Sequence, residues 1–260
     1  MRSLSTAGTG MLAQQTNVDV ISNNIANMNT TAFKRQRAEF QDLLYQQVAR
    51  PGGGTGGEAR APSGIQIGAG VRTAGTYRIA EQGALSQTGN RYDVAIQGKG
   101  YFAVTLPDGG TAYTRAGSFQ LSDQGELVTS DGYPVQPGIT VPADAVDVTV
   151  SKTGEVQVKT AGNVELATVG QIQLATFVNE AGLEALGGNL LVETAASGQA
   201  TIASPGEPGM GSLSQGFLES SNVNPVAEIT ALITAQRAYE MNSRVVKTAD
   251  EMLATTSQMR

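Results

Sequence analysis

Hydrophobic residues near the two ends of the chain recur at alternating spacings of three and four, which predicts helices. In the N-terminal segment, Met1 to about Met28, Gln14 is the one polar residue in this pattern. A helix of that length measures about 40 Å. Gly8, Gly10 and the asparagines between 23 and 29 are poor helix formers, so this helix needs a packing partner. The patterned positions are Leu4, Ala7, Met11, Gln14, Val18, Ile21, Ile25 and Met28.

The same spacing returns in the last segment, from about Asn224 to Arg260. Asn224 followed by Pro225 predicts a helix start, because Asn caps free N–H groups and Pro fits the first helical position. The polar Asn242 costs stability within the pattern but can fix the register of paired helices. The patterned positions are Leu232, Ala235, Tyr239, Asn242, Val246, Ala249, Leu253 and Thr256.

Between these segments the pattern changes to a period of two, which is typical of strands. Val146, Val148 and Val150 alternate with polar residues, and Gly-containing turns separate this run from similar ones. Roughly ten short strands at this spacing predict a β-sandwich or an irregular barrel. The other strands expected are Asp93 to Ile96, Tyr101 to Leu106, Val156 to Val158, Thr168 to Phe177 and Asn189 to Thr194.

A Gly- and Pro-rich stretch, Ala49 to Gly75, separates the first helix from the strands. It is either a flexible linker or an extended arm that becomes ordered against a neighbour. The preceding residues, 33–48, fit a helix or a strand. The expected fold class is α+β, with coiled-coil-type terminal helices, a β-rich sandwich or irregular barrel in the middle, and an extended spacer arm. The expected domains are an N-terminal helix over 1–32, the spacer arm over 33–75, a β-rich domain over 76–220 and a C-terminal helix over 221–260.

Composition removes most catalytic chemistry. The chain has no Cys and no His, which excludes Cys/His zinc sites, thiol nucleophiles and triads with an imidazole base. Asp108, Asp123 and Asp131 each have a Gly one or two residues later, which is a turn signature and not an acid–base pair. No catalytic, cofactor-binding or metal-binding residues are expected, and the protein is not expected to be an enzyme.

The net charge of −6, without a basic stripe, argues against nucleic acid as a partner. No apolar run approaches the roughly 20 residues that span a bilayer. The first fifteen residues lack the apolar block of a secretory signal peptide. Taken alone, these features indicate the cytoplasm.

The two helical patterns admit two interpretations. The helices can pair within one subunit and cap the β-domain, or they can bundle with the ends of other copies. The weak propensity of the N-terminal segment and the polar Gln14 and Asn242 favour bundling with other copies. Contacts between copies whose rotation does not close produce open helical polymers.

Three blocks of sequence resemble the family of flagellar basal-body rod and hook proteins. The first is Ile21 to Asn27 with Thr31 to Lys34, and the second is Gly98 to Val104 with Tyr113 to Phe119. One departure is Ala32, where the family usually has Gly. The third block contains Leu218 to Asn224, Gln236 to Ser243 and Ala249 to Leu253.

The resemblance implies a structural subunit that polymerises helically into a hollow drive shaft, with the terminal helices as the inner layer and the β-domain outside. Length and the Gly-rich insertion are most similar to distal rod subunits. The implied partners are further copies, proximal rod proteins, the hook protein, the ring proteins, the export apparatus and the rod cap. The implied location is the basal body, from periplasm to outer membrane, reached without a cleaved signal peptide.

Two alternatives remain at this point: another axial rod or hook-type subunit, and a secreted carbohydrate-binding β-protein. The residues expected at the assembly interface are Leu4, Met11, Val18, Ile21, Ile25, Met28, Leu232, Tyr239, Asn242, Val246 and Leu253. The family-motif residues are Asn24, Asn27, Phe33, Gly100, Phe102, Asn222, Gln236, Arg237 and Tyr239.

Overall fold

The computed structural model describes residues 2–49, 64–160 and 165–258 of the 260-residue chain. The chain folds into two compact units, each of which is described by itself. Unit 1 contains the residues up to 26 together with 36–78 and those from 224 onward. Unit 2 contains residues 27–35 and 79–223. Terminal helices and a β-rich middle give the expected α+β class.

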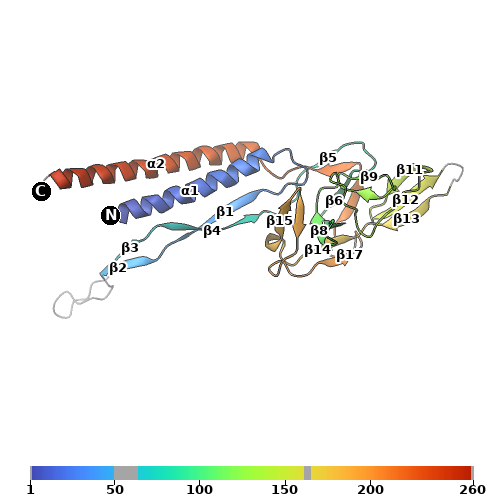
Figure 1. Cartoon of the computed structure of the whole chain (residues 1–260), viewed down its shortest axis with the longest axis horizontal. Coiled ribbons are helices and arrows are strands. Elements are labelled where there is room, and N and C mark those ends of the chain that lie inside the picture. The colour runs from blue at the N-terminus through green and yellow to red at the C-terminus, as the bar shows by residue number, and fades with distance from the viewer. Residues whose placement is uncertain (1, 50–63, 161–164, 259–260) are drawn as a thin grey trace. The chain divides into compact units, whose positions relative to one another are not determined.

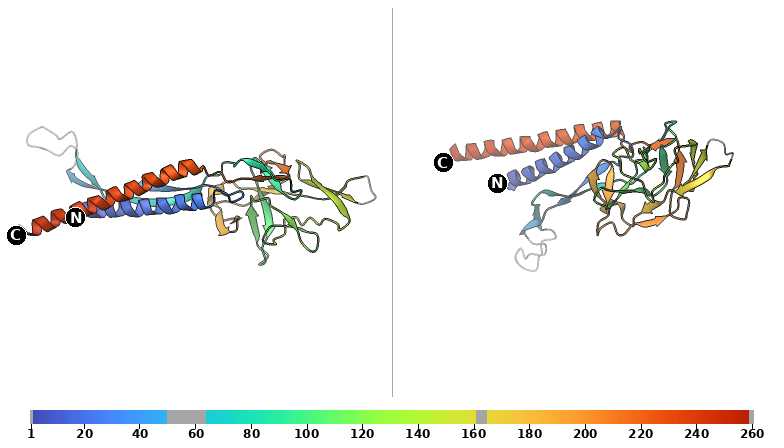
Figure 2. Two further views of the ribbon diagram at one scale, coloured as in Figure 1. Left: turned by 90° about the horizontal axis from the view of Figure 1, so that it is seen from above. Right: turned by 45° about the vertical axis from the view of Figure 1, so that its right-hand side comes forward.

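Unit 1 contains the two long helices, α1 (Arg2–Ala26) and α2 (Pro225–Gln258), which lie side by side in every view of Figures 1 and 2. The helix start expected at Asn224 is confirmed. Its side-chain oxygen accepts hydrogen bonds from the backbone N–H groups of Val226 and Ala227, at 3.1 and 3.2 Å. The side chain of Thr256 lies outside the described residues.

The first helix ends earlier than expected. It stops at Ala26, and residues 27–32 form turns in unit 2, so Met28 does not continue the helical pattern. The physical reason is local, because Asn27 and Asn29 favour turns over helix.

The rest of unit 1 is a pair of antiparallel ribbons. Strand β1 (Gln36–Asp42) pairs with β4 (Val71–Arg78), and β2 (Tyr45–Ala49) pairs with β3 (Ile65–Gly68). The stretch 33–48, for which helix and strand were both open, therefore contributes strands. Residues 50–63 of the Gly-rich stretch lie outside the described residues.

Unit 2 is built on a six-stranded antiparallel sheet, in the order β15-β16-β8-β7-β14-β17. Consecutive residues of β7 point to opposite faces of this sheet, so Tyr101 and Phe102 enter different hydrophobic clusters. The strands are β15 (Glu184–Gly187), β16 (Leu190–Val192), β8 (Thr111–Thr114), β7 (Tyr101–Thr105), β14 (Leu174–Thr176) and β17 (Thr201–Ala203).

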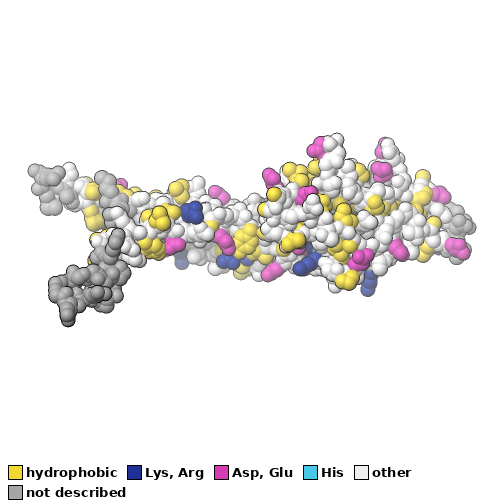
Figure 3. Space-filling view, turned by 90° about the horizontal axis from the view of Figure 1, so that it is seen from below, with side chains coloured by type: hydrophobic (Ala, Val, Ile, Leu, Met, Phe, Trp, Pro, Cys, Tyr) yellow, Lys and Arg dark blue, Asp and Glu magenta, His cyan; other side chains and the backbone are white. Residues whose placement is uncertain are grey.

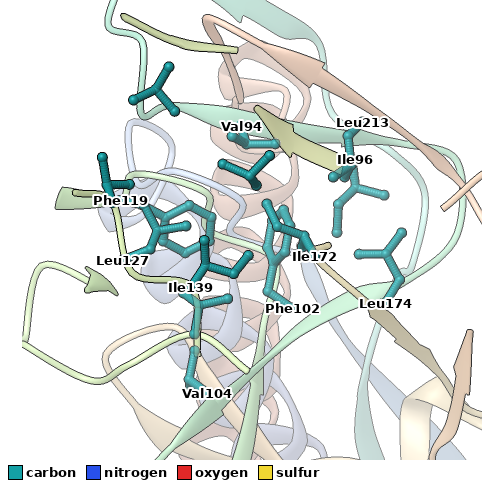
Figure 4. Packing of buried hydrophobic residues seen from close by; sticks show 14 of the residues in the cluster. Val94, Ile96, Phe102, Val104, Phe119, Leu127, Ile139, Ile172, Leu174 and Leu213 are labelled. Carbon is teal, nitrogen blue, oxygen red and sulfur yellow. The ribbon is translucent and has the colours of Figure 1, made fainter. Parts of the chain in front are cut away.

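Both clusters are closed to solvent. On one face Phe102 packs edge-on against Phe119 with ring centroids 5.0 Å apart, and both rings are at most 1% exposed (Figure 4). On the other face Phe177 lies edge-on against Tyr113 at 4.8 Å. The sheet is therefore buried on both sides, and its core belongs to unit 2 alone.

Smaller sheets complete unit 2, and within the described ranges no sheet closes into a barrel. The strand expected over 168–177 is wrong as a single element, because it divides at Ile172 into β13 and β14, which pair in different sheets. The remaining elements are β5 (Leu85–Gln87) with β19 (Phe217–Glu219), β6 (Val94–Gln97) with β18 (Ser212–Gln215), β9 (Gln120–Leu121) with β10 (Leu127–Val128), the sheet of β11 (Ala145–Val150), β12 (Glu155–Thr160) and β13 (Ala167–Gln171), and the 3-10 turn η1 (Glu180–Gly182).

Candidate assembly interface

The helices of unit 1 pack against each other and run antiparallel. Gly10 lies directly against Asn242, because a Cβ atom added to Gly10 would stand 2.9 Å from Nδ2 of Asn242. Further along the pair, Nδ2 of Asn24 donates to Oε2 of Glu228 at 3.1 Å. These two contacts fix the register of the pair, since a shift of one helix would break both of them.

Asn24 also forms hydrogen bonds with the first residue of strand β1. Its side chain is 1% exposed, and Nδ2 donates to the carbonyl of Gln36 at 2.8 Å. The N–H of Gln36 in turn donates to Oδ1 of Asn24 at 2.8 Å. One amide therefore binds the first residue of β1 and the first turn of α2, which explains why Asn serves at this position.

Residues seven apart lie on nearly the same side of a helix, so each helix can be described by rows at heptad spacing. The rows that face the partner helix, here called the inner rows, are mostly small or polar. Ala7 and Ile21 are 5% exposed each, and Ala235 and Ala249 are 2% and 5% exposed. The inner rows are Ala7, Gln14 and Ile21 with Gly10, Asn17 and Asn24 on α1, and Glu228, Ala235, Asn242 and Ala249 on α2.

The large apolar residues stand beside the inner rows and not within them. On each helix they follow an inner row by four positions, and in an antiparallel pair this places them on the same side of the contact. Tyr239 and Leu253 are 43% exposed each, and the others are half-buried. We call this set the ridge: Leu4, Met11, Val18 and Ile25 on α1, and Leu232, Tyr239, Val246 and Leu253 on α2.

The assembly residues expected from the sequence thus fall in three places. Ile21 and Asn242 lie in the inner rows, where they pack within the chain. Met28 lies beyond α1 and is 39% exposed in unit 2. All the others belong to the ridge.

In unit 2, the three sequence motifs meet at a buried cluster of charges. Glu219 is 2% exposed, and its two carboxylate oxygens bind Nζ of Lys34 at 2.5 Å and Nε of Arg115 at 2.6 Å. The terminal nitrogens of Arg115 donate to the carbonyls of Gly98 and Gly100, at 2.5 and 2.9 Å. The cluster joins three segments that are distant in sequence, and the single negative charge of Glu219 is shared between two cations.

The charges of this cluster shift one another's titration. Burial alone would raise the pKa of Glu219, but the Arg115 charge and the hydrogen bond and charge of Lys34 outweigh it and hold that pKa below its ordinary value. Burial lowers the pKa of Lys34, and its hydrogen bond and ion pair with Glu219 offset only part of that shift. Glu219 is therefore held ionised by its two partners.

The side chain of Asn222 links three segments near the charge cluster by hydrogen bonds. The side-chain oxygen of Asn222 accepts from the N–H of Arg35 at 2.7 Å, and its Nδ2 donates to the carbonyls of Ile79 and Glu81 at 3.0 and 2.9 Å. Asn222 thus joins the residues after the first turn, the residues before β5 and the residues after β19.

Ala32 sits in the turn beside this cluster with φ of 57°, in the left-handed region that favours glycine. It is 8% exposed, and its N–H donates to the carbonyl of Glu219 at 2.8 Å. This is the position where the sequence departs from the family's usual Gly, and the conformation explains the family's preference.

The family-motif residues differ widely in exposure. Gly100 has φ of 135°, and a Cβ there would stand 3.1 Å from Leu174, so this position requires glycine. The buried or hydrogen-bonded members are Asn24, Gly100, Phe102 and Asn222. The half-buried members are Asn27 and Phe33, and the exposed members are Gln236, Arg237 and Tyr239.

Sequence reasoning missed four residues that the structure makes central: Lys34, Arg115, Glu219 and Glu228. Each of the first three stands inside a quoted motif, but none was singled out. For Arg115, Glu219 and Glu228 the available signal was a charged residue between uncharged neighbours in a chain with only 15% charged residues, whereas Lys34 is followed directly by Arg35 and gave no such signal. Charged residues are almost never fully buried unless they are paired with a group of opposite charge.

The described residues contain no cluster of acidic side chains that could hold a metal ion. None of the helices described is both long and apolar enough to cross a membrane. On the face shown in Figure 3, charged side chains are scattered, and hydrophobic ones lie among uncharged polar groups.

The comparisons with known proteins agree along the whole chain. Residues 4–34 match the model described as flagella basal body rod protein, 95–158 the flagellar hook protein FlgE/F/G D1 domain, and 214–259 the flagellar basal body rod FlgEFG protein C-terminal. The chain is 62% identical to the flagellar basal-body rod protein FlgG of Caulobacter vibrioides, over 100% of both chains. It is 42% identical to the FlgG of Bacillus subtilis over 97% of both.

A related rod protein is more distant. The flagellar basal-body rod protein FlgF of Caulobacter vibrioides is 35% identical over 90% of this chain and 88% of its own length. The chain is thus more similar to FlgG, over its full length, than to FlgF, which decides between these two rod proteins. The chain therefore belongs to the family of the flagellar basal-body rod protein FlgG, a structural rod protein of the flagellum.

Proposed function

We propose that this chain polymerises helically into the distal part of the flagellar rod, a hollow shaft that transmits torque and passes exported substrates. In this proposal the two helices of unit 1 form coiled-coil contacts in an inner layer, and unit 2 forms the outer layer. The structural observation that supports it is the ridge, whose large apolar side chains stay partly exposed after α1 and α2 have paired.

The ridge supports assembly for an energetic reason. Burying a fully exposed large apolar side chain gains about 1.5–3 kcal/mol, so a side chain that is already half-buried gains roughly half of that when it becomes fully buried. Tyr239 and Leu253, at 43% exposure, and the half-buried Val18 and Val246 have this gain still available. Packing against another copy would supply it.

The wider setting of the proposal rests on the family relation. Copies of the chain would contact proximal rod proteins at one end of their segment and the hook protein at the other, with ring proteins around them. The export apparatus and the rod cap would act during assembly. The subunits would work between periplasm and outer membrane, after export without a cleaved signal peptide.

The test places a charge on the ridge without disturbing the pair. Tyr239→Asp and Leu253→Asp add a charge at sites that are already partly exposed, so α1 and α2 should still fold. We expect the amount of polymer, measured by sedimentation and electron microscopy, to fall at least tenfold, because a charge buried without a partner costs several kcal/mol. Ile21→Asp is unsuitable here, because Ile21 is buried within the chain.

Lys247→Asp is the matched control, since Lys247 is exposed on the same helix and lies in neither the inner row nor the ridge. It should polymerise normally. Normal rods from the Tyr239 and Leu253 variants would show that the ridge is not an assembly surface.

A further inference from the structure

On the other side of its contact with α1, helix α2 carries a second surface without charge. It consists of two adjacent heptad rows, and none of their residues is charged. We call it the uncharged flank: Ala231, Ala238, Val245 and Met252, with Ala227, Thr234, Met241, Thr248 and Thr255.

This flank exposes several large apolar side chains to solvent. Met241, Val245 and Met252 are 61%, 47% and 59% exposed. The charges of the same helix lie mainly on its outer face, where the exposed Arg237 and Arg244 stand. A helix that packed only against α1 would need one apolar stripe, yet α2 has two, one on each side of the inner row.

The flank also has room for a second helix. Its first half lines part of a groove of about 750 Å³, which Gln14 and Asn17 of α1 also line. Most of the α2 residues that line the groove are small, among them Ala227, Ala231, Thr234, Ala235 and Ala238, while Val226 at the start of the helix is larger. The flank is continuous with the contact between α1 and α2, because Ala231 and Ala238 stand immediately beside the inner row.

We infer that the ridge of one copy docks on the uncharged flank of a second copy. This rests on the proposed function and names the two surfaces that meet. Both surfaces repeat every seven residues along the same helix, one with large side chains and the other partly with small ones. Large residues opposite small ones interdigitate well, whereas two ridges facing each other would leave the groove empty.

The arrangement also explains why copies would continue to add. The ridge and the flank lie on opposite sides of the same helix pair, so a copy that uses its ridge still offers its flank. A contact between two different surfaces is heterologous and leaves an open end unless the rotation closes a ring. Docking of ridge on ridge would instead close a dimer.

Disulfide trapping in the full-length protein tests this directly, because the natural chain contains no Cys. Ridge variants Tyr239→Cys and Val246→Cys are each mixed with flank variants Ala238→Cys and Val245→Cys, the two members carrying tags of different mass. After polymerisation and oxidation, we expect at least one mixture to yield tenfold more cross-linked dimer than either member alone.

The other outcomes separate the inference from the proposed function. Cross-linking of a ridge variant or a flank variant with itself, in excess of all mixtures, would overturn the inference in favour of symmetric docking. Rods that form without any ridge-to-flank cross-link would also overturn it, while the proposed function would stand. If the chain without substitutions forms no polymer, the proposed function fails, and the inference with it.

Discussion

In unit 2 the six-stranded sheet has a hydrophobic cluster on each face, and the buried charges of Lys34 and Arg115 meet a carboxylate. In unit 1 the helices bury mainly small and polar residues against each other and leave larger apolar side chains partly in water. The difference teaches that unit 2 closes its two hydrophobic clusters within the chain, although single side chains such as Val178 stay exposed. In unit 1 the partly exposed apolar side chains instead form a row along the paired helices.

The largest expected effect removes the carboxylate from the charge cluster of unit 2. Glu219→Gln keeps the shape but removes the carboxylate that binds both Lys34 and Arg115, which should cost about 3–5 kcal/mol. The measurement is urea unfolding followed by near-ultraviolet circular dichroism of the buried Tyr101 and Tyr113.

Glu155→Gln, at an exposed position of β12, is the control and should change the unfolding free energy by less than about 0.5 kcal/mol. If Glu219→Gln is too unstable to measure, the double change with Lys34→Met should recover part of the loss, because it removes one of the two cations that Glu219 binds. Equal unfolding free energies for Glu219→Gln and Glu155→Gln would refute the role of the cluster.

Lowering the pH offers a second way to destabilise unit 2. The pKa of Glu219 is lower in the folded protein than its ordinary value, so the unfolded chain takes up its proton at higher pH. The stability from Glu219 is therefore fully present above about pH 4.3 and is lost as the pH falls through the folded-state pKa. Hydrogen exchange between pH 6 and 3 should show peptides around Glu219 losing protection, and constant protection there would contradict the prediction.

A matched pair of glycine substitutions sharpens the description of unit 1. Gly8→Ala should stabilise α1 by up to about 1 kcal/mol, because nothing lies within 4 Å of the added Cβ. Gly10→Ala has the same intrinsic gain but must displace Asn242, so it should be about 1–2 kcal/mol less stable than Gly8→Ala. Thermal unfolding of the two variants is followed by the circular dichroism signal of the helices. Equal melting temperatures would mean that the Gly10–Asn242 contact does not fix the register of α1 and α2.

The smallest effect is expected at Ala32. Because its φ of 57° suits glycine, Ala32→Gly should stabilise unit 2 by about 0.5–1 kcal/mol after the greater entropy of glycine in the unfolded chain is subtracted. Ala38→Gly in β1, where no positive φ is recorded, should destabilise instead. A destabilised Ala32→Gly variant would show that the turn does not hold Ala32 under strain.

Much of the fold could be predicted from local pattern. The alternating spacing around Val18 and Val246 is enough to predict two helices, and the period-two run from Val146 to Val150 is enough to predict strand β11. These patterns are local because the helical and strand periods are set by backbone geometry within a few residues.

Two details that the local pattern did not predict have non-local causes. In the run 168–177 the one local irregularity is Gly170, which does not by itself predict two strands in different sheets. The strand divides where the N–H of Ile172 donates to the carbonyl of Gly154. The charge cluster needs Lys34, Arg115 and Glu219, whose separations of 81 or more positions follow from their numbers and lie beyond any local pattern.

The amino-acid sequence by itself determined that unit 1 has heptad rows, that the middle of the chain is strand, and that three motifs place the chain in the rod family. It did not determine which heptad row faces α1, because rows of Ala and rows of Leu or Val both fit the same spacing. Only the tertiary structure decided this, through Asn24 with Glu228 and Gly10 with Asn242, which turn the small rows inward and leave the large ones outside. The physical reason is that periodicity fixes which residues share a side of a helix, whereas contacts between distant residues fix where that side points.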